Sequence, residues 1–233
     1  RRLINFTYIR PEAIAEYATL SEGDKNAVDG LHADTEPLNG DSQLIDRDAM
    51  WRSKMHALWI IFKAGRTAER QSVFDQFKAD CGSDLEAYAY DKWGAPNGEE
   101  GNWERKFNRN SPEIANLRKQ YPDTLDFYRW LEWIAAEQLS SAQQAAKDAG
   151  MHIGIMSDMA VGVHPSGADV WWNPERFAKG ATVGAPPDMF NQQGQNWSQP
   201  PLSPINLETT GYEAYRNMVH GMFARAGAVR IDH

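Results

Sequence analysis

The sequence predicts an α/β protein with two parts, a mainly helical part over residues 1–150 and a mixed part over residues 151–233. In the first part, apolar residues recur every three or four positions between polar loops, which is the period of helices buried on one face. In the second part, two short apolar runs flank a long loop and a helix, and each run leads into an aspartate. This order indicates part of a parallel barrel, whose sites gather at the carboxyl ends of its strands.

Helices of the first part are placed by their apolar faces and their ends. Glycine at 65 and at 150 can terminate a helix, and Ser111 followed by Pro112 is a typical helix start. The stretch 94–110 is rich in Gly, Pro and Asn and is expected to be loop. Helices are therefore expected over residues 46–65, 67–80, 83–93, 111–121 and 122–149. Their expected inward residues include Trp51, Met55, Leu58, Trp59, Phe62, Val73, Phe74, Phe77, Leu125, Tyr128, Leu131 and Ala135.

Two strands and one helix are expected in the second part. The apolar runs 151–156 and 228–231 are too short for helices and are expected to be strands, the first of them buried. Residues 211–226 are amphipathic, with Tyr212, Tyr215, Met218, Val219, Met222 and Phe223 on the inward face. Between the two expected strands, residues 162–204 are expected to form an irregular loop with one helical turn near Pro174.

Composition narrows the partners. The net charge of −8 without basic patches argues against nucleic acid and anionic membranes, so a neutral partner is expected. One cysteine allows no intrachain disulfide and favours the cytoplasm, and no apolar run approaches the ~20 residues of a spanning helix. The six histidines are scattered, and no phosphate loop or dinucleotide fingerprint is present, so neither a metal nor another cofactor is expected.

The aspartates at 158 and 232 are the candidate chemical groups, since each follows an expected strand. Aspartate is also common in the turns that follow strands. Spacing alone therefore leaves open the interpretation that both aspartates are turn residues without a chemical role. Arg230 lies two residues before Asp232, and strand alternation puts both side chains on one face. A neighbouring guanidinium keeps a carboxylate ionised, which a carboxylate nucleophile needs at neutral pH. A structural ion pair would show the same spacing.

The long loop carries aromatic, amide and carboxylate side chains with few aliphatic residues among them. Aromatic faces stack on sugar rings, and amides and carboxylates bond hydroxyl groups. The other interpretation is a surface loop whose aromatic residues attach it to the core. The residues concerned are Asp169, Trp171, Trp172, Asp188, Phe190, Gln195 and Trp197.

Several ordered motifs resemble the amylomaltases, 4-α-glucanotransferases related to α-amylases. They are Ala-Pro-Pro-Asp-Met-Phe over 185–190, Gly-Gln-Asn-Trp over 194–197 and Val-Arg-Ile-Asp-His over 229–233, together with Ser-Asp-Met-Ala over 157–160 and Ala-Asp-Val-Trp over 168–171. Met189 stands where many members have an aromatic residue, and Ser-Gln-Pro-Pro over 198–201 departs from the usual continuation.

The resemblance implies a partial (β/α)8 TIM barrel of about two strands with a large helical insertion, and a retaining glucanotransferase that needs no cofactor. It assigns Asp232 as the nucleophile, held ionised and oriented by Arg230. Asp158 and His233 would contact the sugar in the cleaved subsite. The loop that shapes the acceptor side would contribute Asp188, Phe190, Gln195 and Trp197. Malto-oligosaccharides and α-1,4-glucans are the implied substrates.

A complete barrel of this kind typically needs about 250 residues and eight strands, so the chain is expected to be an internal piece of the protein. The family's acid/base Glu and a further Asp are expected in another part of the protein. The chain alone is therefore expected to be inactive. Two other functions stay open: an amylase-like hydrolase with the same nucleophile, and a noncatalytic glucan-binding segment.

Overall fold

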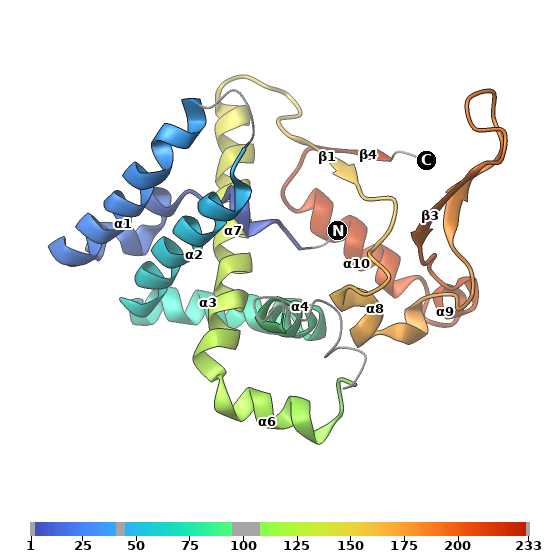
Figure 1. Cartoon of the computed structure of the whole chain (residues 1–233), viewed down its shortest axis with the longest axis horizontal. Helices are drawn as coiled ribbons and strands as arrows, with labels where there is room; N and C mark the ends of the chain where they lie inside the picture. The colour runs from blue at the N-terminus through green and yellow to red at the C-terminus, as the bar shows by residue number, and fades with distance from the viewer. Residues whose placement is uncertain (1–2, 41–44, 95–107, 232–233) are drawn as a thin grey trace. The chain divides into compact units, whose positions relative to one another are not determined.

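A computed structural model of the chain describes residues 3–40, 45–94 and 108–231 (Figure 1). The chain divides into two compact units. The helical unit contains Ile4–Asp80 and Arg129–Leu139, and the mixed unit contains Arg1–Leu3, Cys81–Tyr128 and Ser140–His233. The expected boundary at residue 150 stays a prediction. No helix within the described ranges is both long and apolar enough to cross a membrane.

The helical unit is built from short 3-10 turns and three α-helices, together with the middle of the long helix α7 (Figure 1). Its elements are η1 (Phe6–Tyr8), η2 (Pro11–Ala13), η3 (Ala15–Thr19), α1 (Glu22–Thr35), η4 (Glu36–Gly40), α2 (Arg47–Lys63), α3 (Ala68–Cys81) and α7 (Pro122–Asp148). The expected helices 46–65, 67–80 and 122–149 are confirmed as α2, α3 and α7. Asp46 begins α2, since its side chain accepts a hydrogen bond from the N–H of Ala49.

Aromatic packing forms the core of the helical unit. Trp130 is fully buried, and its ring lies 5.6 Å from that of Phe62. Trp133 stacks on Phe74 with their centroids 5.3 Å apart. The expectations for Leu58, Phe62 and Phe74 are confirmed, but Trp51 and Val73 are exposed. The buried face of α2 runs through 57, 58, 61 and 62, so it is rotated from the expected one.

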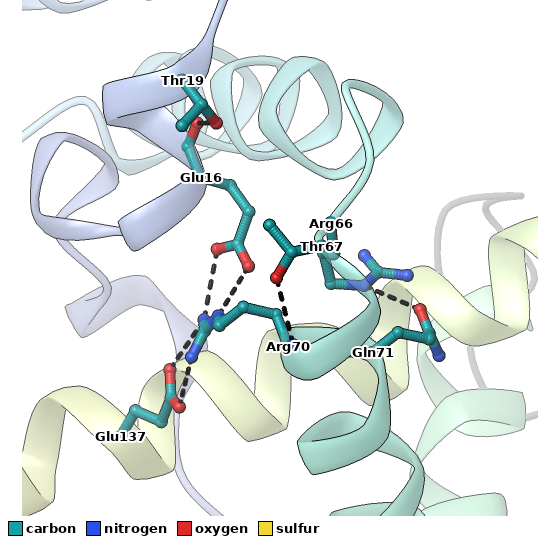
Figure 2. Close-up of polar contacts among 7 residues, drawn as sticks. All are labelled: Glu16, Thr19, Arg66, Thr67, Arg70, Gln71 and Glu137. Carbon is teal, nitrogen blue, oxygen red and sulfur yellow. Dashed lines mark hydrogen bonds and ion pairs between the residues drawn. The ribbon is translucent and has the colours of Figure 1, made fainter.

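Arg70 on α3 joins three parts of this unit (Figure 2). Its guanidinium contacts Glu16 of η3 at 2.8 Å and Glu137 of α7 at 2.7 Å, and it lies 4.1 Å from the ring centre of Trp133. Burial lowers the pKa of Arg70, but the hydrogen bonds to both carboxylates outweigh it, so the pKa lies above its usual range. Glu16 is only 5% exposed and depends on Arg70 as its charge partner.

We therefore expect Arg70→Ala to lower the free energy of unfolding by about 3 kcal/mol, because removing one partner of a buried ion pair leaves the other charge unpaired. Chemical denaturation measures the change. Arg52→Ala is the matched control, since Arg52 is exposed on α2, and a change within about 0.5 kcal/mol is expected for it. Equal effects of the two substitutions would contradict the role of Arg70.

The mixed unit contains the ends of α7, shorter helices and all the described strands. Its elements are α4 (Ser83–Gly94), α6 (Pro112–Gln120), β1 (Met156–Met159), α8 (Ala168–Trp172), η6 (Pro174–Arg176), β2 (Val183–Ala185), β3 (Gln195–Gln199), α9 (Pro204–Thr209), α10 (Glu213–Phe223) and β4 (Ala228–Ile231). Ser111 begins α6, as expected, because its hydroxyl accepts from the N–H of Ile114. The expected loop 94–110 lies mostly outside the described residues.

The described strands form two separate pairs. β1 and β4 are parallel and adjacent, and β2 and β3 form an antiparallel hairpin with a register shift after Val183. The expected strand 228–231 is confirmed as β4. The expected strand 151–156 is wrong in place and burial: β1 begins at Met156, and Met151, Ile153 and Met156 are exposed. Gly154 has a φ of +74°, which interrupts extended backbone before β1.

The β2–β3 hairpin was not expected, because its strands lack the alternating β-branched residues that predict a strand. The helical turn expected near Pro174 is confirmed as η6. The expected helix 211–226 is observed as α10, and of its expected inward residues only Met222 is buried, whereas Tyr215, Phe223 and the capping residue Tyr212 are exposed. The fold is thus a mostly helical α/β arrangement with a few short strands, and it confirms the expected class at that level.

Candidate active site

Asp158 and Arg230 lie opposite each other on neighbouring parallel strands. The register pairs Asp158 of β1 with Arg230 of β4, and Nη1 of Arg230 donates to Oδ1 of Asp158 at 3.2 Å. The side chain of Asp158 is 68% exposed and that of Arg230 is 54% exposed. Parallel pairing brings together two charged groups 72 positions apart in the chain, on a face open to solvent.

The sequence did not reveal this ion pair. It placed both residues in the site but linked Arg230 with Asp232, two positions along the same strand. Asp232 and His233 lie outside the described residues, so their expected roles stay predictions. Only the register between β1 and β4 could have indicated the contact between Arg230 and Asp158, and a register between distant strands does not follow from either strand's own residues.

The tip of the β2–β3 hairpin is a tight turn organised by Asp188. Its Oδ1 accepts from the N–H groups of Phe190 at 2.8 Å and Asn191 at 2.6 Å. Phe190 is 86% exposed and Met189 is 77% exposed, so two large apolar side chains project from this turn. One carboxylate oxygen of Asp188 thus has a local structural task, and its expected contact with substrate stays a prediction.

Gln195 and Trp197 lie two residues apart on β3, which places both side chains on one face of the hairpin. The indole Nε1 of Trp197 donates to Oε1 of Gln195 at 3.2 Å. An indole beside an amide offers an apolar surface and hydrogen-bonding groups together, as a sugar requires. The structure brings together this pair, as it brings together Asp158 with Arg230 and Asp188 with Phe190.

Trp172 serves the core. It is buried on α8 and stacks on Tyr90 of α4 with centroids 5.7 Å apart. Arg109 fixes this region, since its Nη1 donates to the carbonyl oxygen of Trp172 at 2.6 Å and to Oδ1 of Asn173 at 2.9 Å. Of the two interpretations of the aromatic residues in 162–204, attachment to the core therefore applies to Trp172.

Within the described ranges, no three His, Cys, Asp or Glu side chains form a group that could hold a metal ion. The described chemistry consists of a solvent-facing carboxylate and guanidinium on parallel strands, with an aromatic hairpin in the same unit. These features define the class of the chain, a mostly helical α/β segment with charged side chains on two neighbouring strands.

Comparison with known proteins identifies the family. A family model described as 4-alpha-glucanotransferase matches residues 1–233. The 4-alpha-glucanotransferase of Mycobacterium tuberculosis is 39% identical over 238 residues, covering 100% of this chain and 32% of the relative. That of Haemophilus influenzae is 38% identical over 117 residues, covering 50% of this chain and 17% of the relative.

Two solved structures are similar as well. The amylomaltase of Corynebacterium glutamicum has a TM-score of 0.83 and 36% identity, covering 100% of this chain and 31% of that one. The amylomaltase of Streptococcus agalactiae, solved in complex with acarbose, has a TM-score of 0.79 at 18% identity, covering 99% of this chain and 47% of that one, and this likeness concerns the fold alone. The chain belongs to the 4-alpha-glucanotransferase family and spans about a third of the length of the mycobacterial relative.

The exposure of the Arg230–Asp158 pair predicts that the pair contributes little to stability, because exposed ion pairs are typically worth less than about 1 kcal/mol. We expect Asp158→Asn to change the free energy of unfolding by less than about 1 kcal/mol, as measured by chemical denaturation. A loss of several kcal/mol would instead assign the pair a structural role.

Proposed function

We propose that the protein containing this chain is a 4-α-glucanotransferase that moves segments of α-1,4-glucan to an acceptor 4-hydroxyl by retaining double displacement. The observation that carries the proposal is the Arg230–Asp158 pair on neighbouring parallel strands of a family member. We further propose that β1 and β4 belong to a partial (β/α)8 barrel, in which residues 1–150 form a helical insertion and 151–233 a barrel segment.

In the proposed first step, the carboxylate of Asp232 attacks the anomeric carbon while an acid elsewhere in the whole protein protonates the leaving oxygen. Arg230 stands two residues before Asp232 in the sequence, and its guanidinium, which contacts Asp158, is assigned the further task of keeping this nucleophile ionised. Asp158 and His233 contact the sugar in the cleaved subsite.

The second step needs a bound sugar in place of water. We assign the acceptor side to Asp188, Phe190, Gln195 and Trp197 of the hairpin, because the exposed ring of Phe190 and the Gln195–Trp197 pair offer stacking and hydrogen bonding. A bound acceptor has a high effective concentration, and its aromatic surroundings exclude water. Neutral glucans suit a chain with a net charge of −8 and no basic patches.

An amylase-like hydrolase is the alternative enzyme, since the nucleophile would be the same. Incubating the full-length protein with maltotriose separates the two, because transfer redistributes chain length whereas hydrolysis releases reducing ends in proportion to turnover. The third possibility, a noncatalytic glucan-binding segment, predicts binding without either product.

The lone cysteine favours the cytoplasm as the proposed location.

Asp232→Asn in the full-length protein is expected to lower kcat by at least about 10⁴-fold, because an amide cannot form the glycosyl ester. Oligosaccharide binding, measured by calorimetry, should be retained. Asp29→Asn is the matched control, since Asp29 lies on α1 and bonds the hydroxyl of Tyr17, and it should leave kcat unchanged. Wild-type turnover in the Asp232→Asn protein would remove Asp232 from the mechanism.

Residues 1–233 expressed alone are expected to show no disproportionation of maltotriose, because one carboxylate cannot serve as nucleophile and acid/base at once. Product analysis after long incubation measures this, with the full-length protein as the positive control. Chain-length redistribution by the isolated chain would overturn the assignment of the acid/base to another part of the protein.

A further inference from the structure

The side chain of Gln143, near the end of α7, bonds the segment that leads into β1. Its Nε2 donates to the carbonyl oxygen of Ile153 at 3.0 Å, and its Oε1 accepts from the N–H of Ile155 at 2.6 Å. A residue on a neighbouring parallel strand bonds the same two groups, the C=O before and the N–H after its partner. The side-chain amide therefore takes the place of a strand at this point.

Gly154, between the two bonded residues, makes room for the amide. A Cβ at this position would stand 2.4 Å from Oε1 of Gln143 and 2.8 Å from its Cδ. The φ of +74° is also a conformation that side chains other than that of glycine rarely adopt. Gln143 and Gly154 therefore fit each other, and the close approach depends on both.

The same segment continues into the contact with β4. The N–H of Gly227 donates to the carbonyl oxygen of Ile155 at 3.0 Å, and a Cβ on Gly227 would stand 1.9 Å from the carbonyl oxygen of Ile153. The next residue, Ala228, is the partner of Met156 and begins the register that sets Arg230 opposite Asp158. Gln143 thus holds the backbone at the start of the strand pair that carries the site.

We propose that Gln143 is a positioning residue for glucan transfer, which acts by holding residues 153–155 and so fixing the carboxylate of Asp158 relative to Arg230. The inference rests on the proposed function, because it gives Asp158 its role in the cleaved subsite. Gln143 acts through the backbone of β1. Its effect falls on the chemical step, since Asp158 orients the sugar in the cleaved subsite, and a misplacement of about 1 Å caused far from the reacting atoms can cost about 10²-fold in rate.

The test compares Gln143→Ala with Gln144→Ala in the full-length protein. Gln144 is the next residue on α7 and bonds Asp148 of its own helix at 2.7 Å, so its substitution should leave both kinetic parameters unchanged. Gln143→Ala should lower kcat for maltotriose disproportionation at least about tenfold, while KM changes less than about twofold because the hairpin is intact. A kcat equal to that of Gln144→Ala would overturn the proposal.

Gln143→Glu gives a readout that a purely structural role would not move. An ionised carboxylate accepts from the N–H of Ile155 but has no proton for the carbonyl oxygen of Ile153, whereas the protonated acid supplies both bonds. The ratio of the variant's kcat to the wild-type kcat should therefore rise as pH falls through the titration of this carboxyl. A kcat ratio that does not change with pH would overturn the proposal. This test with Gln143→Glu stands even if Gln143→Ala fails to fold.

Hydrogen exchange separates this inference from the proposed function. In Gln143→Ala, the amides of residues 155–159 should exchange faster than in Gln144→Ala, with those of the helical unit unchanged. Equal exchange in the two variants would remove Gln143 as the residue that holds β1. If the full-length wild-type protein transfers no glucan, the proposed function is wrong. Faster exchange in Gln143→Ala would even then show that Gln143 holds β1.

Discussion

Parallel pairing between β1 and β4 is the constraint on which the candidate site depends. Neither strand is buried in the described chain, and the Arg230–Asp158 pair between them is open to solvent. The ion pair cannot hold the strands together, since exposed pairs contribute little. Backbone bonds and close glycine contacts at the start of the strands therefore set the register, and the charged side chains take their positions from it.

Two arginine–carboxylate contacts, those of Arg70 and Arg230, differ in how far they are buried. Arg70 lies between a buried glutamate, a second glutamate and a tryptophan ring, so its charge is committed to the helical unit. Arg230 and Asp158 are more than half exposed, which leaves them accessible to a ligand. The same guanidinium–carboxylate contact is thus largely buried in one unit and open to solvent in the other.

Sequence patterns predicted most of the helices, because caps and breakers such as Ser111, Gly65 and Gly150 act locally. They placed β1 too early, since the apolar residues of 151–155 resemble a strand while Gly154 and Gln143 hold them in another conformation. The β2–β3 hairpin escaped prediction because its polar strands form through pairing with each other. Candidate site residues followed from strand ends, loop composition and motif resemblance, but the Arg230–Asp158 contact needed the register between distant strands.

Gly227 limits which amino acids this position of the chain can hold. The carbonyl oxygen of Ile153 occupies the space where even a methyl group would have to go, so any other amino acid must push the backbone before β1 away from β4. In a saturation library of this region, glycine should survive alone at 227, although the position is exposed and looks permissive by accessibility. Glycine fits this surface position because it has a hydrogen atom where every other residue has a Cβ. The chemistry of the side chain beyond the Cβ has no influence.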